Sequence, residues 1–380
     1  VTAGIFMVAR MSPLYELSEV ALAVILIVGA ITAFFMGLLG IVQNDIKRVV
    51  AYSTLSQLGY MTVALGVSAY GAAIFHLMTH AFFKALLFLG AGSVIIAMHH
   101  EQDIRRMGGL KKFMPVTYWT ALIGSLALIG FPGTSGFFSK DALIEAVKYS
   151  HWQTSDQLVY WIAYGSVLAG VFITALYSFR MFFMVFHGEE RIDEKTRSHL
   201  HETPWVVTGP LIALAIPSAL IGWFTIGPML FGSFFDNVIY VSKSHDVLSF
   251  LGDSFHGSSA FVLHAMQGAA VYLAFAGILV AWYLYLKRPD LSEKIRCSLV
   301  GVNKILNEKY FFDDLYIKGF VAGAQGLGNF LWRRSDESVI DGFIVNGTAR
   351  TIAHFSSILR KIQSGYLYHY AFAMFFGMTI

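Results

Sequence analysis

The sequence is poor in cysteine and in charge. One cysteine, Cys297, stands among 380 residues, which excludes a disulfide framework and any cysteine-ligated iron–sulfur cluster or zinc site within the chain. Charged residues make up 13% of the chain and hydrophobic residues 56%, whereas about 25% of a soluble domain is charged. No glycine-rich nucleotide-binding loop and no haem, flavin or quinone signature is visible. Composition therefore excludes a soluble enzyme and predicts an all-α polytopic membrane protein that holds no cofactor or metal of its own.

Long apolar runs recur along the whole chain. A bilayer is crossed by about 20 apolar residues in a helix, so each run of about 18 or more predicts one span. The run over 114–149 is too long for one straight span, and Phe131-Pro132-Gly133-Thr134-Ser135-Gly136 is expected to break it. Ion transporters place their sites at such discontinuous helices. The predicted spans are 19–42, 50–68, 72–98, 114–149, 157–186, 205–231 and 260–286, with a last helix from near Tyr366.

The loops between these spans carry lysine and arginine unevenly. Alternate loops on one side hold eleven of these residues, and the loops on the other side hold three. Because cytoplasmic loops are enriched in Lys and Arg, the richer set is predicted to be cytoplasmic. That set is Lys47, Arg48, Arg105, Arg106, Lys111, Lys112, Arg191, Lys195, Arg197, Lys287 and Arg288, against Arg10, Lys148 and Lys243.

From Leu291 to about Ser364 the sequence becomes more polar, and its apolar positions recur at helical spacing, as at Ile352, Phe355, Leu359 and Ile362. One continuous amphipathic helix of this length would be about 110 Å long. Because it would start on the cytoplasmic side, it is expected to lie along the membrane. Several short surface helices are the alternative.

One helix centre carries a charge. Lys84 lies about halfway along the predicted span 72–98, and His76, His80 and Lys84 recur at every fourth residue, so they share one face. A charge at the centre of a membrane helix costs about 2.5–3.5 kcal/mol, so it is expected to face the protein interior. The column can act as a proton relay through water. A structural lysine paired with an acid on a neighbouring helix is the alternative.

A second lysine follows the predicted helix break. Lys140 lies beside the non-helical segment, and burial disfavours its charged form, so it is expected to exchange a proton near neutral pH. Asp141 can be its counter-ion or an acid at the helix start, and Glu145, one turn on, is expected nearer the interface.

Other polar residues carry weaker signals. A metal site at His187, His199, His201 and Glu202 is not expected, because histidines in a loop are usually solvated. No role is assigned to Asp253, His256 or His264.

Four segments carry a family resemblance. They are QNDIKRVVAYSTLSQLGYM (43–61), HLMTHAFFKALLFLGAGSVI (76–95), HEQDIRRMGGLKKFMP (100–115) and GFPGTSGFFSKD (130–141). They resemble the antiporter-like proton-pumping membrane subunits of respiratory complex I. The C-terminal motifs NEKYFFDDLY (307–316) and IQSGYLYHYAFAMFFGM (362–378) resemble the member of that family with a long lateral helix.

The resemblance implies two inverted five-helix repeats. Residues 1–18 would hold the end of the first repeat and a loop, and 19–187 the second repeat with its broken helix. Two further transmembrane helices over 188–290, the lateral amphipathic helix over 291–364 and the start of an anchoring helix over 365–380 would follow. The chain opens without Met and closes within an apolar run, so it is expected to be a fragment of a longer protein.

The resemblance also implies a mechanism. The family's central lysine matches Lys84, with His76 and His80 as its water-linked partners, and the lysine of its broken helix matches Lys140. Protons would pass between them, driven by electron transfer in partner subunits that hold NADH, FMN, iron–sulfur clusters and quinone. Expected partners are other membrane-arm subunits, above all neighbouring antiporter-like subunits contacted by the lateral helix, together with lipid and protons. No nucleic acid is expected.

The expected location is the bacterial inner membrane, with the lateral helix on the cytoplasmic side. Three other interpretations remain. The chain can be the large subunit of an Mrp-type sodium/proton antiporter, a relative of membrane-bound hydrogenase subunits, or a non-pumping brace of the membrane arm. A brace requires no column of His76, His80 and Lys84 in mid-membrane.

Overall fold

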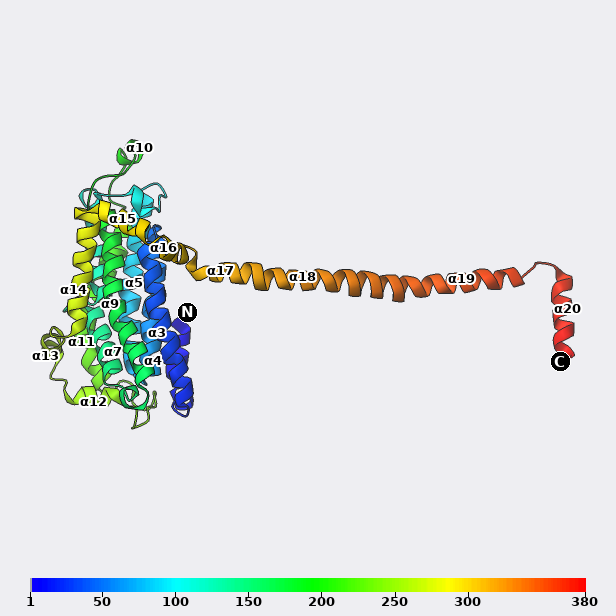
Figure 1. The fold of residues 1–380 in the computed structure, drawn as a ribbon, viewed down its shortest axis with the longest axis horizontal. Coiled ribbons are helices and arrows are strands. Elements are labelled where there is room, and N and C mark those ends of the chain that lie inside the picture. The colour runs from blue at the N-terminus through cyan, green and yellow to red at the C-terminus, as the bar shows by residue number, and fades with distance from the viewer. Residues whose placement is uncertain (1) are drawn as a thin grey trace. The chain divides into compact units, whose positions relative to one another are not determined.

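The structure, a computed structural model, describes residues 2–380, and within that range it contains helices and loops but no β-strand. The chain divides into two compact units, Val1–Asn307 and Glu308–Ile380. The first unit is a helical bundle, drawn from blue to yellow in Figure 1. Five of its helices are long and apolar enough to cross a membrane: Glu19–Val42, Tyr70–Ala97, Gln157–Phe186, Trp205–Phe231 and Ala269–Lys287. The polytopic all-α prediction is confirmed.

The bundle is built on helices α3 (Glu19–Val42), α4 (Ile46–Gly66), α5 (Tyr70–Ala97) and α9 (Gln157–Phe186), followed by α11 (Trp205–Ile226) and α14 (Ala269–Trp282). α4 is long enough to span but is less apolar, because it contains buried Ser53, Ser56 and Gln57. These polar groups point into the bundle, so a low hydropathy here reflects internal contacts. The remaining short elements of this unit are α1 (Thr2–Arg10), α2 (Ser12–Tyr15), η1 (Ile104–Arg106), η2 (Leu110–Lys112), α8 (Trp152–Ser155), α10 (Glu194–Arg197), η3 (Gly227–Phe231), α12 (Val247–Asp253), α13 (Ser258–Ala265), η4 (Tyr283–Lys287), α15 (Pro289–Ser298) and α16 (Val300–Asn307).

The predicted break in 114–149 is present. α6 (Pro115–Ile129) ends at Gly130, whose φ of 78° is left-handed, and α7 (Ser135–Lys148) begins five residues later. Gly133 also has a positive φ, of 87°. Glycine adopts this backbone without the steric cost that a side chain would bring. The sequence places the break correctly because Pro132 and two glycines fall together within an apolar run.

The predicted span 260–286 is wrong at its start. α13 ends at Ala265, and the membrane-length helix begins only at Ala269. Gly268 adopts an extended backbone at the junction and its N–H bonds back to the Ala265 carbonyl. The apolar run continues across the junction, so hydropathy alone does not reveal this interruption.

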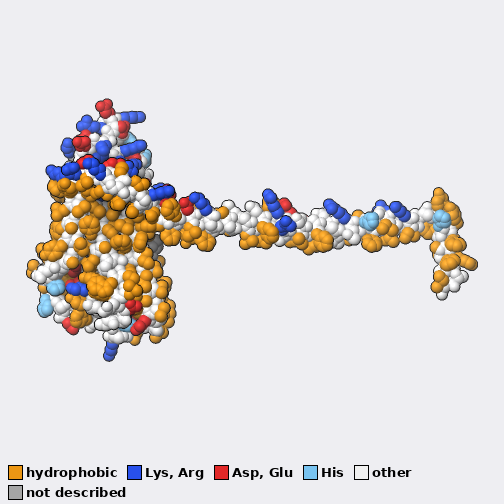
Figure 2. Space-filling model, in the orientation of Figure 1, with side chains coloured by type: hydrophobic (Ala, Val, Ile, Leu, Met, Phe, Trp, Pro, Cys, Tyr) orange, Lys and Arg blue, Asp and Glu red, His pale blue; other side chains and the backbone are white. Residues whose placement is uncertain are grey.

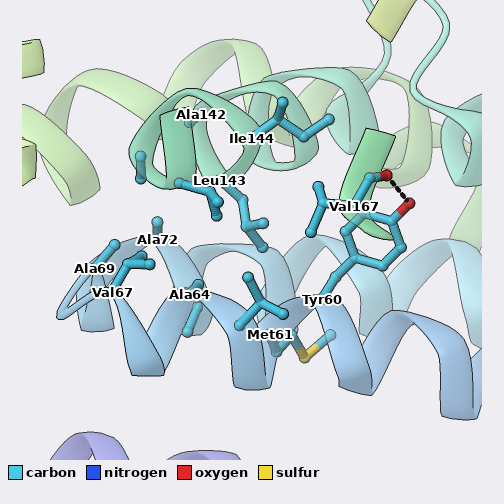
Figure 3. Packing of buried hydrophobic residues seen from close by; sticks show 14 of the residues in the cluster. Tyr60, Met61, Ala64, Val67, Ala69, Ala72, Ala142, Leu143, Ile144 and Val167 are labelled. Atoms are coloured by element: carbon cyan, nitrogen blue, oxygen red, sulfur yellow. Dashed lines mark hydrogen bonds between the residues drawn. The ribbon is translucent and has the colours of Figure 1, made fainter. Parts of the chain in front are cut away.

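Helices of the bundle approach one another closely. A Cβ placed at Gly59 of α4 would lie 2.3 Å from the backbone nitrogen of Ala33 in α3, and one at Gly66 would lie 2.6 Å from Leu26. Figure 3 shows the apolar packing beside these contacts, where the Tyr60 hydroxyl donates a hydrogen bond of 2.7 Å to the Val167 carbonyl of α9. The core therefore fixes α4 tightly between α3 and α9.

The second unit is dominated by one long helical run. It starts at η5 (Lys309–Phe311) and then runs without a break through α17 (Phe312–Asp314), η6 (Leu315–Val321), α18 (Ala322–Phe330), η7 (Leu331–Asn346) and α19 (Gly347–Ile362); α20 (Leu367–Met378) follows a turn. Along the run, hydrophobic side chains gather on one edge and lysines and arginines on the other (Figure 2). The amphipathic pattern is as predicted.

A single helix from Leu291 to Ser364 is not what forms. α15 ends at Ser298, α16 ends at Asn307, and Lys309, Tyr310 and Phe311 have positive φ values that no regular helix contains. The apolar period of 3.6 continues on both sides of these junctions, which is why the pattern suggests one helix. The glycines at 319, 323, 326 and 328 and the acids Asp313 and Asp314 do not interrupt the long run.

Candidate functional site

The column expected on α5 is buried in the bundle. The side chains of His76, His80 and Lys84 follow one another along the helix, and at most 4% of any of the three residues is exposed. The ring centroids of the two histidines lie 6.1 Å apart. Lys84 makes no ion pair of 4 Å or less with any acid among residues 2–380. The structure therefore places the charge at depth without the acidic partner that a simple structural lysine would need.

Neutral hydroxyl and amide groups from α4 face this column. The Lys84 ammonium donates a hydrogen bond of 2.6 Å to Ser53 Oγ, and the Tyr177 hydroxyl of α9 donates to the same oxygen at 2.9 Å. His76 Nε2 lies 3.2 Å from Gln57 Oε1. A hydroxyl donates and accepts hydrogen bonds, so Ser53, held by Tyr177, can stabilise Lys84 in both its charged and its neutral form.

The second lysine comes from α7, just after the break. Ser139 Oγ lies 2.9 Å from His76 Nδ1 and 2.7 Å from Thr79 Oγ1, which joins α7 to the α5 column. The neighbouring Lys140 is 2% exposed, and its Nζ lies 4.8 Å from the centre of the Tyr60 ring and has no hydrogen-bond partner among residues 2–380. The aromatic face attracts the ammonium without fixing it in one hydrogen bond.

Asp141 fits neither expected local role. It forms no ion pair with Lys140, and α7 begins at Ser135, so Asp141 lies beyond the first turn. Its carboxylate is buried, and Oδ2 has no hydrogen-bond partner within the described chain. A cavity of about 10 Å³ is lined by Lys140, Asp141 and Gly130 at the helix break. This is about the size that one water molecule needs.

The sequence did not predict the polar residues of α4 that contact the column and Lys140. Ser53, Gln57 and Tyr60 occupy positions i, i+4 and i+7 of α4, so they share one helix face. This spacing is a recognisable signal within an otherwise apolar helix. By contrast, no local pattern links Tyr177 of α9 to Ser53, because the two residues meet only through helix packing.

The other noted histidines do not join the site. Among residues 2–380, no group of three or more His, Cys, Asp or Glu side chains is placed to hold a metal ion. Glu202 instead caps α6, where its carboxylate accepts hydrogen bonds from the Val116 and Thr117 nitrogens at 2.7 and 3.2 Å. His264 Nε2 lies 3.5 Å from Glu145 Oε1, near the end of α7.

The loop that follows α5 is rich in paired charges. Arg105 Nη2 lies 2.6 Å from Asp103 Oδ2, and Arg106 Nη1 lies 3.0 Å from Glu101 Oε2. All four side chains are partly open to solvent. The hydrogen bonds from Arg105 lower the pKa of Asp103 below its usual value. Figure 2 shows such side chains gathered at one end of the bundle, beyond the apolar band. The charges of this loop are thus partly solvated and paired, unlike Lys84 and Lys140.

Comparison with known proteins agrees with this architecture. Residues 1–163 match the family described as the NADH:quinone oxidoreductase/Mrp antiporter transmembrane domain. A chain in the solved structure of the Mrp complex from Dietzia sp. DQ12-45-1b superposes with a TM-score of 0.62 at 20% identity, covering 95% of this chain and 36% of that one. At this identity the likeness shows the fold alone.

Curated relatives match the whole chain. NADH-quinone oxidoreductase subunit L of Neisseria meningitidis serogroup A is 53% identical across 100% of this chain and 58% of its own length. Chain 5 of NADH-ubiquinone oxidoreductase from Marchantia polymorpha is 39% identical across 100% of this chain and 56% of its own length. The chain thus spans somewhat more than half the length of these relatives. Over its whole length it is similar to subunit L of NADH-quinone oxidoreductase and to chain 5 of NADH-ubiquinone oxidoreductase, and its residues 1–163 match the NADH:quinone oxidoreductase/Mrp antiporter transmembrane family.

Proposed function

We propose that this chain moves protons across the membrane as part of an NADH–quinone oxidoreductase. In this proposal, His76, His80, Lys84, Lys140 and Asp141 carry the proton. Electron transfer takes place in partner subunits, and this chain contributes only translocation. The proposal rests on similarity to subunit L and on one structural observation: two buried lysines on α5 and α7 have no acidic partner within the described residues, and histidine, serine and threonine side chains between them link the two helices.

The contacts suggest the order of the groups. Lys84 and Ser53 lie at one end of the column, His80 and His76 follow along α5, and Ser139 leads across to α7 and Lys140. His80 Nε2 and Lys140 Nζ have no hydrogen-bond partner in the described chain. Water can bridge such groups where they border a polar cavity. A proton would enter from the side of the basic loops, pass from Lys84 to Lys140 and leave on the opposite side.

Electrostatic interactions between the lysines can supply the free energy of moving a proton against the membrane potential. Moving one charge against 100 mV costs about 2.3 kcal/mol. A change of under two pKa units at one lysine supplies that, because each unit is worth about 1.4 kcal/mol. Repulsion between neighbouring protonated lysines, biased by electron transfer in partner subunits, can therefore drive the step without a redox centre in this chain.

The partners and the orientation form part of the same proposal. In this proposal the start of α4, with Lys47 and Arg48, and the basic loop 98–114 face the cytoplasm of a bacterial cell, because cytoplasmic segments are enriched in Lys and Arg. The long amphipathic run of the second unit presents one apolar edge (Figure 2), which neighbouring antiporter-like subunits and lipid can cover. The Mrp likeness, which shows the fold alone, does not favour sodium transport over proton transport.

The decisive experiment compares two buried lysines with an exposed one. Lys84→Met and Lys140→Met are introduced into the complete subunit, and inverted membrane vesicles are assayed for NADH oxidation and NADH-driven acidification together. We expect roughly tenfold or greater loss of acidification, because a positioned proton carrier contributes at least this much. Lys47→Met, at an exposed position in the first turn of α4, the helix that also carries Ser53, is the matched control.

Assembly of the complex is checked by the amount of intact oxidoreductase in the membrane. If Lys84→Met and Lys140→Met both pump as the wild type does, the relay proposal is wrong and the lysines are structural. If all three lysine variants lose activity equally, the position of the lysine does not matter and the proposed pathway also fails.

A further inference from the structure

A second group of buried ionisable side chains lies at the other end of the bundle from the basic loops. Glu16 precedes α3, His151 lies between α7 and α8, and His245 precedes α12. These segments are distant in sequence and meet on the side opposite the Lys-rich and Arg-rich loops. Only 1% of the Glu16 side chain and 9% of the His245 side chain are exposed.

The three side chains are in direct contact. His245 Nδ1 lies 2.9 Å from Glu16 Oε2, and the rings of His245 and His151 are stacked with their centroids 4.1 Å apart. Glu16 also accepts a hydrogen bond of 2.8 Å from the Tyr70 hydroxyl and one of 3.1 Å from the Ser242 nitrogen. Tyr70 is the first residue of α5, so the group is attached to the helix that carries His76, His80 and Lys84.

His151 differs from its neighbours in having no partner for its ring nitrogens. Both Nδ1 and Nε2 are buried and neither makes a hydrogen bond within residues 2–380. Burial, together with the adjacent His245, lowers the pKa of His151 to about 4, and Glu16 opposes this shift only in part. Burial on its own would raise the pKa of Glu16, but contacts with Ser68, His245 and Tyr70 outweigh it and the pKa falls.

Other charges near the group are engaged elsewhere. Lys148, at the end of α7, lies over the Tyr149 ring, and Asp246 caps α12 by accepting a hydrogen bond from the Ser249 nitrogen. Neither residue, nor Lys243, forms an ion pair with the three side chains. Among residues 2–380, Glu16 is the acid that pairs with this stack, through His245, and its single negative charge can balance one proton on the two imidazoles but not two.

We propose that Glu16, His151 and His245 form the proton-release end of the pathway, where a proton arriving at His151 expels the one held by His245 and Glu16. This inference rests on the proposed function and assigns its exit. The N–H bond formed on His151 is matched by the N–H bond lost from His245, and the released proton passes to water at the surface. Repulsion between two imidazolium rings at stacking distance drives the step.

Helices α5 and α7 both extend from the central column towards Glu16, His151 and His245. Asp141 and Lys148 are seven residues apart on α7, about 10 Å along the axis, and His76 and Tyr70 are six apart on α5, about 9 Å. Glu145, between Asp141 and Lys148, contacts His264. Proton transfer over these gaps requires water between side chains, as in the central column.

The test uses the complete subunit within the assembled oxidoreductase, in inverted vesicles whose lumen is the release side. His151→Gln removes a titratable group without breaking a hydrogen bond, so folding should be retained. Glu16→Gln removes the negative charge. We expect both variants to lose acidification at least tenfold, because a positioned proton donor or acceptor typically contributes about 10²–10⁴-fold. His256→Gln, an exposed histidine on the same side that bonds only to its own loop, is the matched control.

Luminal pH gives a second measurement, which a merely structural role would not change. A protonated release group cannot load again, so wild-type pumping should fall as the lumen is acidified. Glu16→Gln weakens proton binding at His245, so the midpoint of that fall should move to lower pH. If His151→Gln and Glu16→Gln pump normally with an unshifted midpoint while Lys140→Met does not pump, the exit assignment is wrong and the proposed function stands. If Lys140→Met also pumps normally, the proposed function itself fails.

Discussion

The two units of the chain differ in the burial and pairing of their lysines. In the bundle, Lys84 and Lys140 are almost fully buried and neither forms an ion pair within the described chain. In the second unit, Lys318 pairs with Asp314 at 2.9 Å, one helical turn apart, and both side chains are largely open to solvent. The first arrangement costs free energy and the second costs almost none. A buried charge without an ion-pair partner is therefore a better indication of a functional residue than an exposed charge in an ion pair.

Glycine shows the same contrast. Gly59 and Gly66 in α4 leave no room for a Cβ because neighbouring backbone lies under 3 Å away. Gly323, Gly326 and Gly328 in α18 have open space around them. Glycine thus sets the distance between helices in the bundle, whereas these three glycines of α18 have no steric role.

The largest effect is expected from filling the close contact in the bundle. In Gly59→Ala, the added Cβ would meet the Ala33 nitrogen at 2.3 Å, so α3 and α4 must separate. Overpacking of this kind costs about 3 kcal/mol. The amount of assembled subunit in the membrane and its thermal stability in detergent measure the loss.

Gly326→Ala is the matched substitution in the second unit. It meets no atom within 4 Å, and alanine favours a helix over glycine by about 1 kcal/mol, so stability should hold or rise. Equal loss of stability in Gly59→Ala and Gly326→Ala would contradict the contrast between the units.

A smaller effect is expected from removing the hydroxyl beside Lys84. Ser53→Ala takes away the hydrogen-bond acceptor shared by Lys84 and Tyr177, and an unsatisfied buried group costs about 1–3 kcal/mol. Acidification should fall more than NADH oxidation. Ser357→Ala, which removes a hydroxyl bonded only to the His354 carbonyl one turn away, should leave both rates unchanged.

The smallest effect is expected at the exposed ion pair. Lys318→Ala leaves Asp314 in solvent, so neither stability nor pumping should change measurably in physiological salt. Assay of the purified oxidoreductase at low and high ionic strength checks this. A pumping defect in Lys318→Ala would show that the second unit transmits coupling through its charged face.

Much of the fold follows from local sequence. The helix α3 has the predicted bounds 19–42 and α9 has the predicted bounds 157–186, because apolar length and flanking caps are encoded within each segment. The start of α14 and the junctions at Leu299 and Lys309 are missed, since the apolar pattern continues through them. Hydropathy indicates which residues avoid water, but it does not indicate where the helical backbone is interrupted.

The sequence by itself determined that the chain spans a membrane, that one of its helices is broken and that Lys84, Lys140 and two histidines lie at depth. Spacing of 3.6 residues and the cost of burying charge are sufficient for those conclusions. Only the tertiary structure decided what surrounds them: Ser53 and Tyr177 at Lys84, Tyr60 at Lys140, and the contact between Glu16, His151 and His245. Those partners come from helices and loops far apart in sequence, and packing alone brings them together.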